Sequence, residues 1–322
     1  MNRFFYGCIA LFILGNIYAH PGIGLVYDGQ RYIYYTDLTH VWRLDTETGE
    51  KQIAIENVHT HELHLDKDGN LFGEHYWYVE SEQKFKNYIW KLDKDGNFNK
   101  IRDDLDGENT DFGFIRDKDF RSYRIKEVDE LYRIERSDSM TTEVLFSGEL
   151  KHPGWKYLSS DNTLYFVDYP TIYAFKESEL IILAEDISAR RFPFSIQSND
   201  HDIYGIWTDE SDNIFVAIYG GRMVKSINPE GKIESVLKTS MFWSPINGVF
   251  DSEGNLWLME SRLNGKIRVR QIDRNEFYQN NSFFFENLFW IILLSIPVVY
   301  LIWRIRAKKL QKKRNKFVVD TA

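Results

Sequence analysis

Residues 63–78 read LHLDKDGNLFGEHYWY and show the unit from which most of this chain is built. An apolar segment ends at an Asp, a turn containing Gly and Asn follows, and a second segment rich in aromatic residues comes after the turn. Alternation of apolar and polar residues is typical of strands, and Gly and Asn tolerate the positive φ angles of tight hairpins. The stretch therefore predicts two antiparallel strands joined by a short turn.

The same unit recurs along the chain, clearly at residues 205–219 (GIWTDESDNIFVAIY) and 248–261 (GVFDSEGNLWLMES), and more weakly at 24–37 and 154–168. Each copy is followed by a third alternating segment, which we expect to be a strand: 40–45, 88–93, 172–175, 223–228 and 266–273. A fourth strand usually follows. The pattern predicts four-stranded antiparallel blades.

The units begin near residues 24, 62, 111, 154, 205 and 247, a spacing of roughly 40 to 50 residues that is typical of propeller blades. Residues 109–150 fit the repeat poorly, because they lack the Gly-Asn turn. Seven blades would need a further unit, and an open sandwich would not repeat so regularly. The sequence predicts an all-β, six-bladed β-propeller over residues 20–282.

The N-terminal segment 1–19 has the features of a cleavable signal peptide, because Arg3 precedes an apolar run and Ala19 is a small residue at a possible cleavage position. An uncleaved anchor is the alternative, but the run is shorter than the roughly 20 residues that span a bilayer.

Residues 283–303 are apolar apart from Glu286, Asn287 and Ser295, which predicts one transmembrane helix, with a buried core helix as the alternative. The tail 304–322 is basic, and by the positive-inside rule we expect it in the cytoplasm. The protein would then be a single-pass membrane protein, with residues 20–282 outside the cytoplasm.

Charge and cysteine content exclude some classes. The body holds 31 of the 40 Lys and Arg and 46 of the 48 Asp and Glu, a formal net charge of −15, which disfavours nucleic acid as a partner. The only cysteine, Cys8, lies in the predicted signal peptide, so we expect no disulfide in the mature protein. There is neither a Gly-x-Ser-x-Gly nucleophile motif nor a phosphate-binding glycine loop.

Residues 203–233 and 247–258 resemble NHL-repeat propellers and the related gluconolactonase (senescence marker protein)-like and streptogramin-lyase-like groups. The resemblance covers essentially residues 20–273 and implies the six-bladed fold. It implies little about the reaction, because one fold hosts many functions.

Seven of the eight histidines, all except His64, fall at one predicted end of the propeller. There the loops lead into the innermost strands, and ligands usually bind at such a channel mouth. Imidazoles from different blades can hold a divalent metal, with zinc the first expectation. The NHL-like resemblance includes a peptide-amidating lyase whose zinc lies on three channel histidines from separate blades, and the positional matches here are His61, His152 and His201.

The sequence also offers two alternative metal sites. The gluconolactonase-like resemblance implies an oxygen set of Glu62, Asn247 and Asp202, which would favour calcium. The α-amino group and imidazole of His20, if signal cleavage exposes them, would chelate copper. His75, Asp168 and Glu260 end second strands at the same predicted face and are candidate catalytic proton-transfer groups.

These features favour a membrane-anchored propeller that binds a small molecule, peptide or glycan at its channel mouth, as a metal-dependent hydrolase or lyase. The alternative is a non-catalytic platform for protein or glycan binding at the cell surface. Aromatic residues near the same face, among them Tyr76, Trp77 and Trp243, are expected mainly in the core, with some available to stack on a flat ligand.

Overall fold

The computed structural model describes residues 22–106, 115–138, 140–187, 202–240, 242–262 and 264–273, with the side chains of 103–106 left out, and positions 295, 300, 301, 303, 304 and 306. The chain separates into two units, Met1–Gln279 and Asn280–Ala322. The described positions of the second unit are helical. Among the residues that the structure describes, no helix has the length and apolar character needed to cross a membrane. The predicted signal peptide and most of the predicted membrane helix and tail lie outside the described residues.

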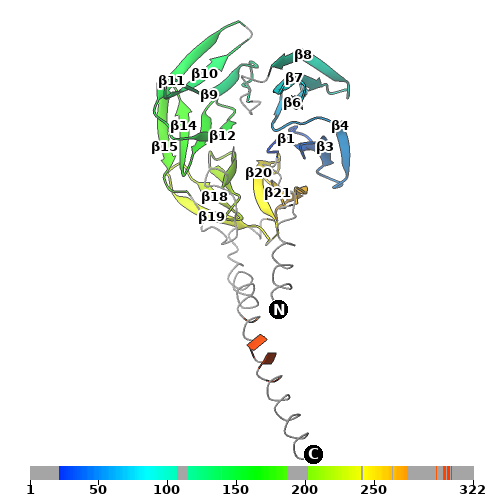
Figure 1. Cartoon of the computed structure of the whole chain (residues 1–322), viewed down its shortest axis with the longest axis vertical. Coiled ribbons are helices and arrows are strands. Elements are labelled where there is room, and N and C mark those ends of the chain that lie inside the picture. Colours follow the sequence, from blue (N-terminus) through cyan, green and yellow to red (C-terminus); the bar gives the residue numbers. More distant parts are fainter. Residues whose placement is uncertain are drawn as a thin grey trace, which may run out of the picture. The chain divides into compact units, whose positions relative to one another are not determined.

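The described strands form six antiparallel sheets that follow one another in sequence order, and each sheet is one blade. The strands of blades 1 to 3 are β1 (Leu25–Tyr27), β2 (Tyr32–Thr36), β3 (His40–Asp45), β4 (Lys51–Glu56); β5 (Leu63–Leu65), β6 (Leu71–Val79), β7 (Lys84–Leu92), β8 (Phe98–Asp106); β9 (Ser122–Val128), β10 (Leu131–Ser137) and β11 (Thr142–Gly148). Those of blades 4 to 6 are β12 (Pro153–Leu158), β13 (Leu164–Asp168), β14 (Thr171–Lys176), β15 (Glu179–Ala184); β16 (Ile203–Thr208), β17 (Ile214–Ile218), β18 (Met223–Ile227), β19 (Ile233–Lys238); β20 (Ser244–Phe250), β21 (Leu256–Ser261) and β22 (Ile267–Gln271). Figure 1 shows the blades arranged in this order around a common centre.

The predicted all-β, six-bladed propeller is confirmed. Blades 1, 2, 4 and 5 have four strands each, whereas blades 3 and 6 have three among the described residues. In blade 3 the described strands are the second, third and fourth of the blade. The innermost position is taken by Arg116, which precedes β9 and forms an isolated bridge with Ser122 of that strand. The five predicted third strands coincide with or overlap β3, β7, β14, β18 and β22.

A side-chain clamp fixes the turn between the first and second strands of a blade. In blade 2 the Oδ1 atom of Asp66 accepts hydrogen bonds from the amides of Asp68 and Asn70, both at 2.9 Å, and the Asn70 side chain donates to Oδ2 at 2.7 Å. Asp209 and Asp251 hold the turns of blades 5 and 6 in the same way. In blades 2, 5 and 6 the Asp that ends the first apolar segment of the repeat is therefore a structural residue of the hairpin.

Blade 3 uses the same clamp with other residues, which explains why residues 109–150 fit the repeat poorly in the sequence. Asp117 accepts the amides of Asp119 and Arg121 at 3.0 and 2.9 Å. The guanidinium of Arg121, 2.8 Å away at Nε, takes the place of the Asn side chain. The turn is the same one, and only its sequence signature has changed.

Hydrophobic clusters between neighbouring blades form the core. One cluster joins blades 4 and 5, a second joins blades 5 and 6, and a third joins blades 3 and 4. Trp90, Tyr204 and Phe166 are among the largest fully buried side chains. Gly205 lets β16 approach β20, since a Cβ there would collide with the carbonyl oxygen of Ile246.

The segment before β1 closes the ring, because it forms hydrogen bonds both to the loop that leads into blade 2 and to blade 6. The amides of Ile23 and Gly24 donate to the carbonyl oxygen of His61 at 2.9 and 2.7 Å, and the side chain of Asn247 donates to the carbonyl oxygen of Ile23 at 2.8 Å. The hydroxyls of Tyr27 and Ser252 lie 3.1 Å apart across the same junction. The beginning and the end of the described propeller are thus tied together.

Candidate functional site

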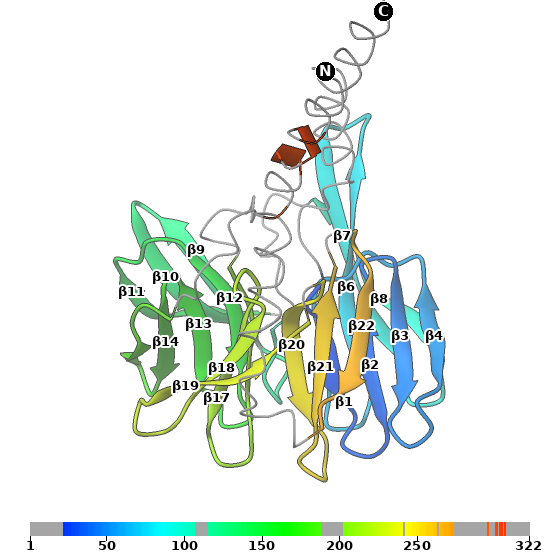
Figure 2. The same cartoon turned by 90° about the horizontal axis from the view of Figure 1, so that it is seen from below.

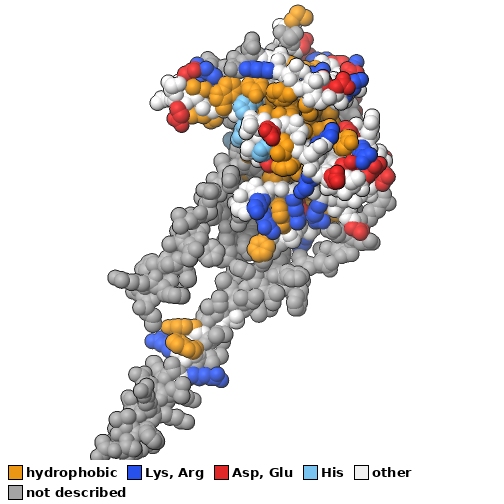
Figure 3. Space-filling view, turned by 90° about the vertical axis from the view of Figure 1, so that its right-hand side faces the viewer, with side chains coloured by type: hydrophobic (Ala, Val, Ile, Leu, Met, Phe, Trp, Pro, Cys, Tyr) orange, Lys and Arg blue, Asp and Glu red, His pale blue; other side chains and the backbone are white. Residues whose placement is uncertain are grey.

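The two ends of the propeller differ in chemistry. In each blade the innermost strand runs toward the first turn and the second strand runs back, so the loop leading into a blade and the end of its second strand meet at one end. We call this end the histidine face, defined by His59, His61, His75 and His152. The other end, formed by turns such as residues 66–70, we call the hairpin face. Figure 3 shows histidine side chains gathered beside hydrophobic side chains on one side of the described surface.

The three predicted proton-transfer residues occupy equivalent positions. His75, Asp168 and Glu260 are each the fifth residue after the last residue of the clamped turn, in β6, β13 and β21. Asp168 is the last residue of β13, and Glu260 is the last but one of β21. His75 is followed by further strand residues, because β6 and β7 are extended to nine residues each. Figure 2 shows the tip of this hairpin (cyan) reaching past the neighbouring strands.

A cluster of three histidines forms the blade 2 part of the histidine face. The amide of His59 donates to Nδ1 of His75 at 2.8 Å, so neutral His75 carries its proton on Nε2. The rings of His59 and His61 meet edge to face at 4.7 Å between centroids, and His61, only 5% exposed, also meets the ring of Tyr76 at 5.8 Å. The cluster is therefore held by both backbone and ring contacts.

Tyr76 connects this cluster to a buried charge that the sequence analysis did not single out. Its hydroxyl donates to the carboxylate of Glu74, which is 5% exposed. Burial raises the pKa of Glu74, while the Tyr76 hydrogen bond and the charges of Arg116 and Arg102, 4.0 and 3.7 Å away, oppose that rise. Burial lowers the pKa of Arg116 to about 10. Glu74 and His75 are consecutive residues of β6. Because successive side chains of a strand point to opposite faces, the sequence indicated that Glu74 faces the other side of the blade from His75.

In blade 4 the carboxylate of Asp168 holds the loop that carries His152. It accepts hydrogen bonds from the amide of His152 at 2.6 Å and from that of Lys151 at 3.0 Å. Asp168 is 3% exposed, whereas the side chain of His152 is exposed. Asp168 and His75 thus do the same local work, since each accepts a hydrogen bond from the backbone of the loop leading into its own blade.

In blade 6 Glu260 is fully buried and paired with two arginines of the next strand. Its Oε2 atom accepts hydrogen bonds from Nε of Arg268 at 2.7 Å and of Arg270 at 2.9 Å. Arg268 also lies 4.0 Å above the ring of Trp243, in a cation–π contact. Within the described part of the chain Oε1 of Glu260 has no hydrogen-bond partner.

The predicted metal ligands are only partly described. His61 and His152 lie on the histidine face, in the loops that lead into blades 2 and 4, whereas His201 and His20 fall outside the described residues. Among the residues that are described, no three His, Cys, Asp or Glu side chains are grouped as a metal site requires. His59 and His61 are the histidines that pack most closely, and two imidazoles suit a zinc-like cation.

The oxygen set considered for calcium has other contacts. The side chain of Asn247 spans Ile23 and Gly248, donating to the carbonyl of the first and accepting from the amide of the second. Asp202, 2% exposed, accepts a hydrogen bond from the hydroxyl of Tyr169 at 3.3 Å. Glu62 is buried as well, at 8% exposed.

Comparisons with solved structures find the same fold. An auxiliary nutrient binding protein from Bacteroides thetaiotaomicron has a TM-score of 0.52 at 11% identity, over 79% of this chain and 69% of that one. A gluconolactonase from Xanthomonas campestris has a TM-score of 0.47 at 14% identity, over 75% and 84%. A streptogramin B lyase has a TM-score of 0.44 at 15% identity, over 80% and 97%. No curated protein sequence matches this chain significantly.

A family model extends the likeness from fold to sequence. The model described as the SMP-30/Gluconolactonase/LRE-like region matches residues 21–253, which is most of the propeller. The expected resemblance to the gluconolactonase-like and streptogramin-lyase-like propellers is confirmed by this match. The chain belongs to the SMP-30/Gluconolactonase/LRE-like family.

Proposed function

We propose that the histidine face binds a small ligand together with a divalent metal, zinc first, held by His61, His152 and His201, and that the protein is a hydrolase or lyase. Residues 283–303 would anchor it in a membrane, with the propeller outside the cytoplasm and the basic tail inside. Membership of a family named after gluconolactonase supports a small-molecule ligand.

The observation that carries the proposal lies at the mouth of blade 2, where the ring of His59 packs against that of His61 and the amide of His59 donates to His75. His61 is buried, at 5% exposed. Its place beside a second histidine and Tyr76, on a face that also carries His152, supports a binding role. The fixed loops present these side chains in one orientation, as a preorganised site requires.

The chain's own groups would divide the work. His61 and His152 would bind the metal, which when present would polarise a carbonyl or activate a water. His75 is held at Nδ1 by the His59 amide, so Nε2 is the atom at which it would give up or receive a proton. Asp168 would act mainly by positioning His152, since both its oxygens accept backbone hydrogen bonds.

Glu260 would contribute through charge. Two arginines donate hydrogen bonds to one of its oxygens, and the other oxygen has no hydrogen-bond partner in the described part of the chain. Because Glu260 is fully buried, it would act by holding Arg268 and Arg270 in place rather than by meeting a substrate directly. Glu74, linked to His61 through Tyr76, would take part in orienting the blade 2 histidines.

The extended hairpin of blade 2 favours a second function, a non-catalytic platform for a protein or glycan. Tyr78 and Phe85, 44% and 48% exposed, meet edge to face at 5.0 Å near its tip, and Trp77 stacks on His75 at 5.3 Å. Exposed aromatic side chains on a rigid hairpin are common in binding surfaces.

Metal analysis separates the two functions. Residues 20–282, purified without a polyhistidine tag, would be examined by elemental analysis as wild type, as His61→Ala/His152→Ala, and as His64→Gln, which changes a histidine away from the histidine face. We expect near-stoichiometric metal in the wild type and in His64→Gln, and a loss in the double variant. A folded wild-type protein that stays metal-free after incubation with zinc, copper and calcium would favour the platform.

A further inference from the structure

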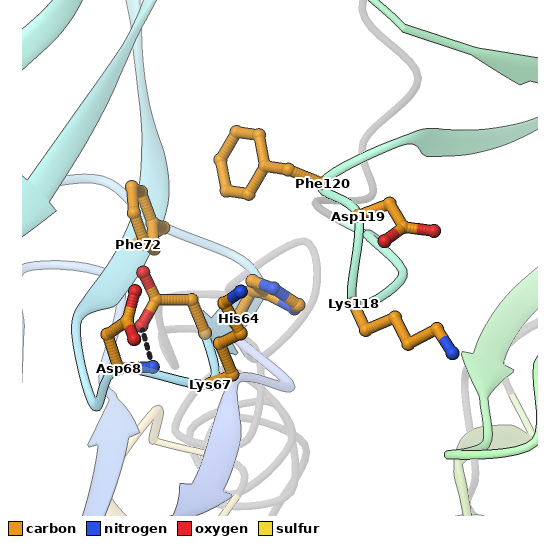
Figure 4. A pocket seen from close by; sticks show the side chains of 8 residues that line it. His64, Lys67, Asp68, Phe72, Lys118, Asp119 and Phe120 are labelled. Atoms are coloured by element: carbon orange, nitrogen blue, oxygen red, sulfur yellow. Dashed lines mark hydrogen bonds between the residues drawn. The ribbon is translucent and has the colours of Figure 1, made fainter.

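A pocket of about 450 Å³ lies on the hairpin face between blades 2 and 3, away from the histidine cluster. Its aromatic wall consists of His64 from β5, Phe72 from β6 and Phe120 from the turn of blade 3. The rings of Phe72 and Phe120 lie 4.8 Å apart, and that of His64 lies 5.9 Å from Phe120. Figure 4 shows Phe120 reaching from its turn toward Phe72.

Phe120 occupies a backbone position that normally excludes a large side chain. Its φ is +65°, and the matching positions in the turns of blades 2, 4, 5 and 6 are filled by Gly69, Asn162, Asp212 and Gly254. A bulky residue in the left-handed region costs on the order of 1 kcal/mol or more. The ring is still 36% exposed, so packing into the core compensates that cost only in part.

The rim of the pocket is charged, and two of its cations have no counter-ion. Lys67 and Lys118 are the second residues of the two turns, and in the described part of the chain neither forms an ion pair. Three acids also line the pocket: Asp66 is occupied by the clamp of its own turn, Asp119 lies 3.3 Å from Arg121, and Asp68 is exposed. Lys67 and Lys118 are thus the cations of the rim that would meet an anion, with the carboxylate of Asp68 beside them.

His64 adds an apolar, neutral surface rather than a third charge. Burial, with a smaller contribution from Arg116, lowers its pKa to about 4. The ring is therefore uncharged at neutral pH and can stack on a flat molecule. The size of the pocket falls within the range usual for small-molecule sites, about 300–1,000 Å³.

From this geometry we infer a second ligand site, separate from the histidine face, for a flat aromatic molecule that carries a carboxylate. Its ring would lie against Phe72, Phe120 and His64, and its carboxylate would reach Lys67 and Lys118. The strained Phe120 would then be kept because it completes the aromatic wall. The site does not depend on the function proposed for the other face.

The test uses the full-length chain and indole-3-acetate as the probe, followed by ligand-observed saturation-transfer NMR. Indole has the ring without the carboxylate, and acetate has the carboxylate without the ring. We expect transfer to indole-3-acetate, at least fivefold weaker transfer to indole, and none to acetate. Equal transfer to indole and indole-3-acetate would overturn the role of the lysines.

Three variants locate the site. Phe120→Gly removes the ring at a position where glycine is unstrained, and Asp212→Gly is the matched change at the same turn position of blade 5. We expect the first to abolish transfer and the second to leave it intact. Lys67→Gln/Lys118→Gln, at exposed positions, should lower the affinity at least fivefold without a change in melting temperature. Wild-type binding by Phe120→Gly or by the lysine variant would refute the site.

Discussion

At the scale of single residues, several charged groups on the histidine face are engaged in holding backbone. The carboxylate of Asp168 is buried and accepts hydrogen bonds from the amides of Lys151 and His152. Hydrogen bonds to an ionised carboxylate are roughly twice as strong as those between neutral groups. Asp168 therefore fixes the position of His152, and any catalytic role would come on top of this one.

We expect Asp168→Asn to lower the free energy of unfolding by about 1–2 kcal/mol, because the amide loses the charge and turns an NH2 donor toward backbone donors. Urea denaturation followed by tryptophan fluorescence measures the change. Asp95→Asn, in the exposed turn between β7 and β8, is the control and should cost less, because the Asp95 side chain accepts no hydrogen bond within the described part of the chain. Equal losses in the two variants would argue against the structural role of Asp168.

His64 should make the stability of the propeller depend on pH. Burial lowers its pKa from 6.5 to about 4, so between these values the unfolded chain binds a proton that the folded chain does not. Above pH 6.5 this difference has no effect, and the free energy of unfolding falls as the pH falls from 6.5 toward 4, by an amount on the order of 3 kcal/mol. We expect unfolding curves of His64→Gln to lack this part of the slope. The same slope in wild type and variant would contradict the account.

At the scale of elements, the clamped turn decides how much of the fold can be predicted. Where the turn reads Asp-x-x-Gly-Asn, as at residues 66–70, the sequence signals the hairpin directly. In blade 3 Arg121 replaces the Asn and Phe120 the Gly, and the equivalence emerges only from the hydrogen bonds to Asp117. Sequence patterns record residue types, whereas the clamp depends on donors that several residue types supply.

The clamp of blade 6 should contribute more to the free energy of unfolding than the clamp of an exposed turn. Asp251 accepts hydrogen bonds from the Glu253 and Asn255 backbone and also from Nε1 of Trp257 at 2.9 Å, whereas Asp93 holds an exposed turn without a tryptophan. We expect Asp251→Ala to cost about 2–3 kcal/mol and Asp93→Ala at most about 1 kcal/mol. Thermal and urea unfolding measure both, and the reverse order would show that the clamp does not stabilise the blade.

At the scale of the whole molecule, contacts between distant segments complete both the ring and the candidate site. The repeat period predicted six blades and one histidine-rich face, since both follow from the order of strands. The sequence did not predict that Asn247 joins blade 6 to Ile23, nor that Tyr76 links His61 to Glu74. The first pairing depends on the rotation between blades, and the second depends on how the loop that carries His61 packs against β6; no local pattern encodes either.

Ring closure gives a stability test at this scale. The Asn247 side chain makes hydrogen bonds to Ile23 and Gly248 at 2.8 and 2.9 Å. We expect Asn247→Ala to lower the free energy of unfolding by about 1–3 kcal/mol, because it leaves a carbonyl and an amide at the junction without these partners. Asn97→Ala, in an exposed turn, is the control. Urea unfolding would refute the closure if the two variants were equally stable.

The most direct test of the proposed site is a crystal structure of residues 20–282 grown with zinc, with anomalous data collected at the zinc edge. We expect one strong peak on the histidine face, with nitrogens of His61, His152 and His201 at about 2.0–2.1 Å. A peak bound by other residues, or no peak at this face in well-ordered crystals, would contradict it.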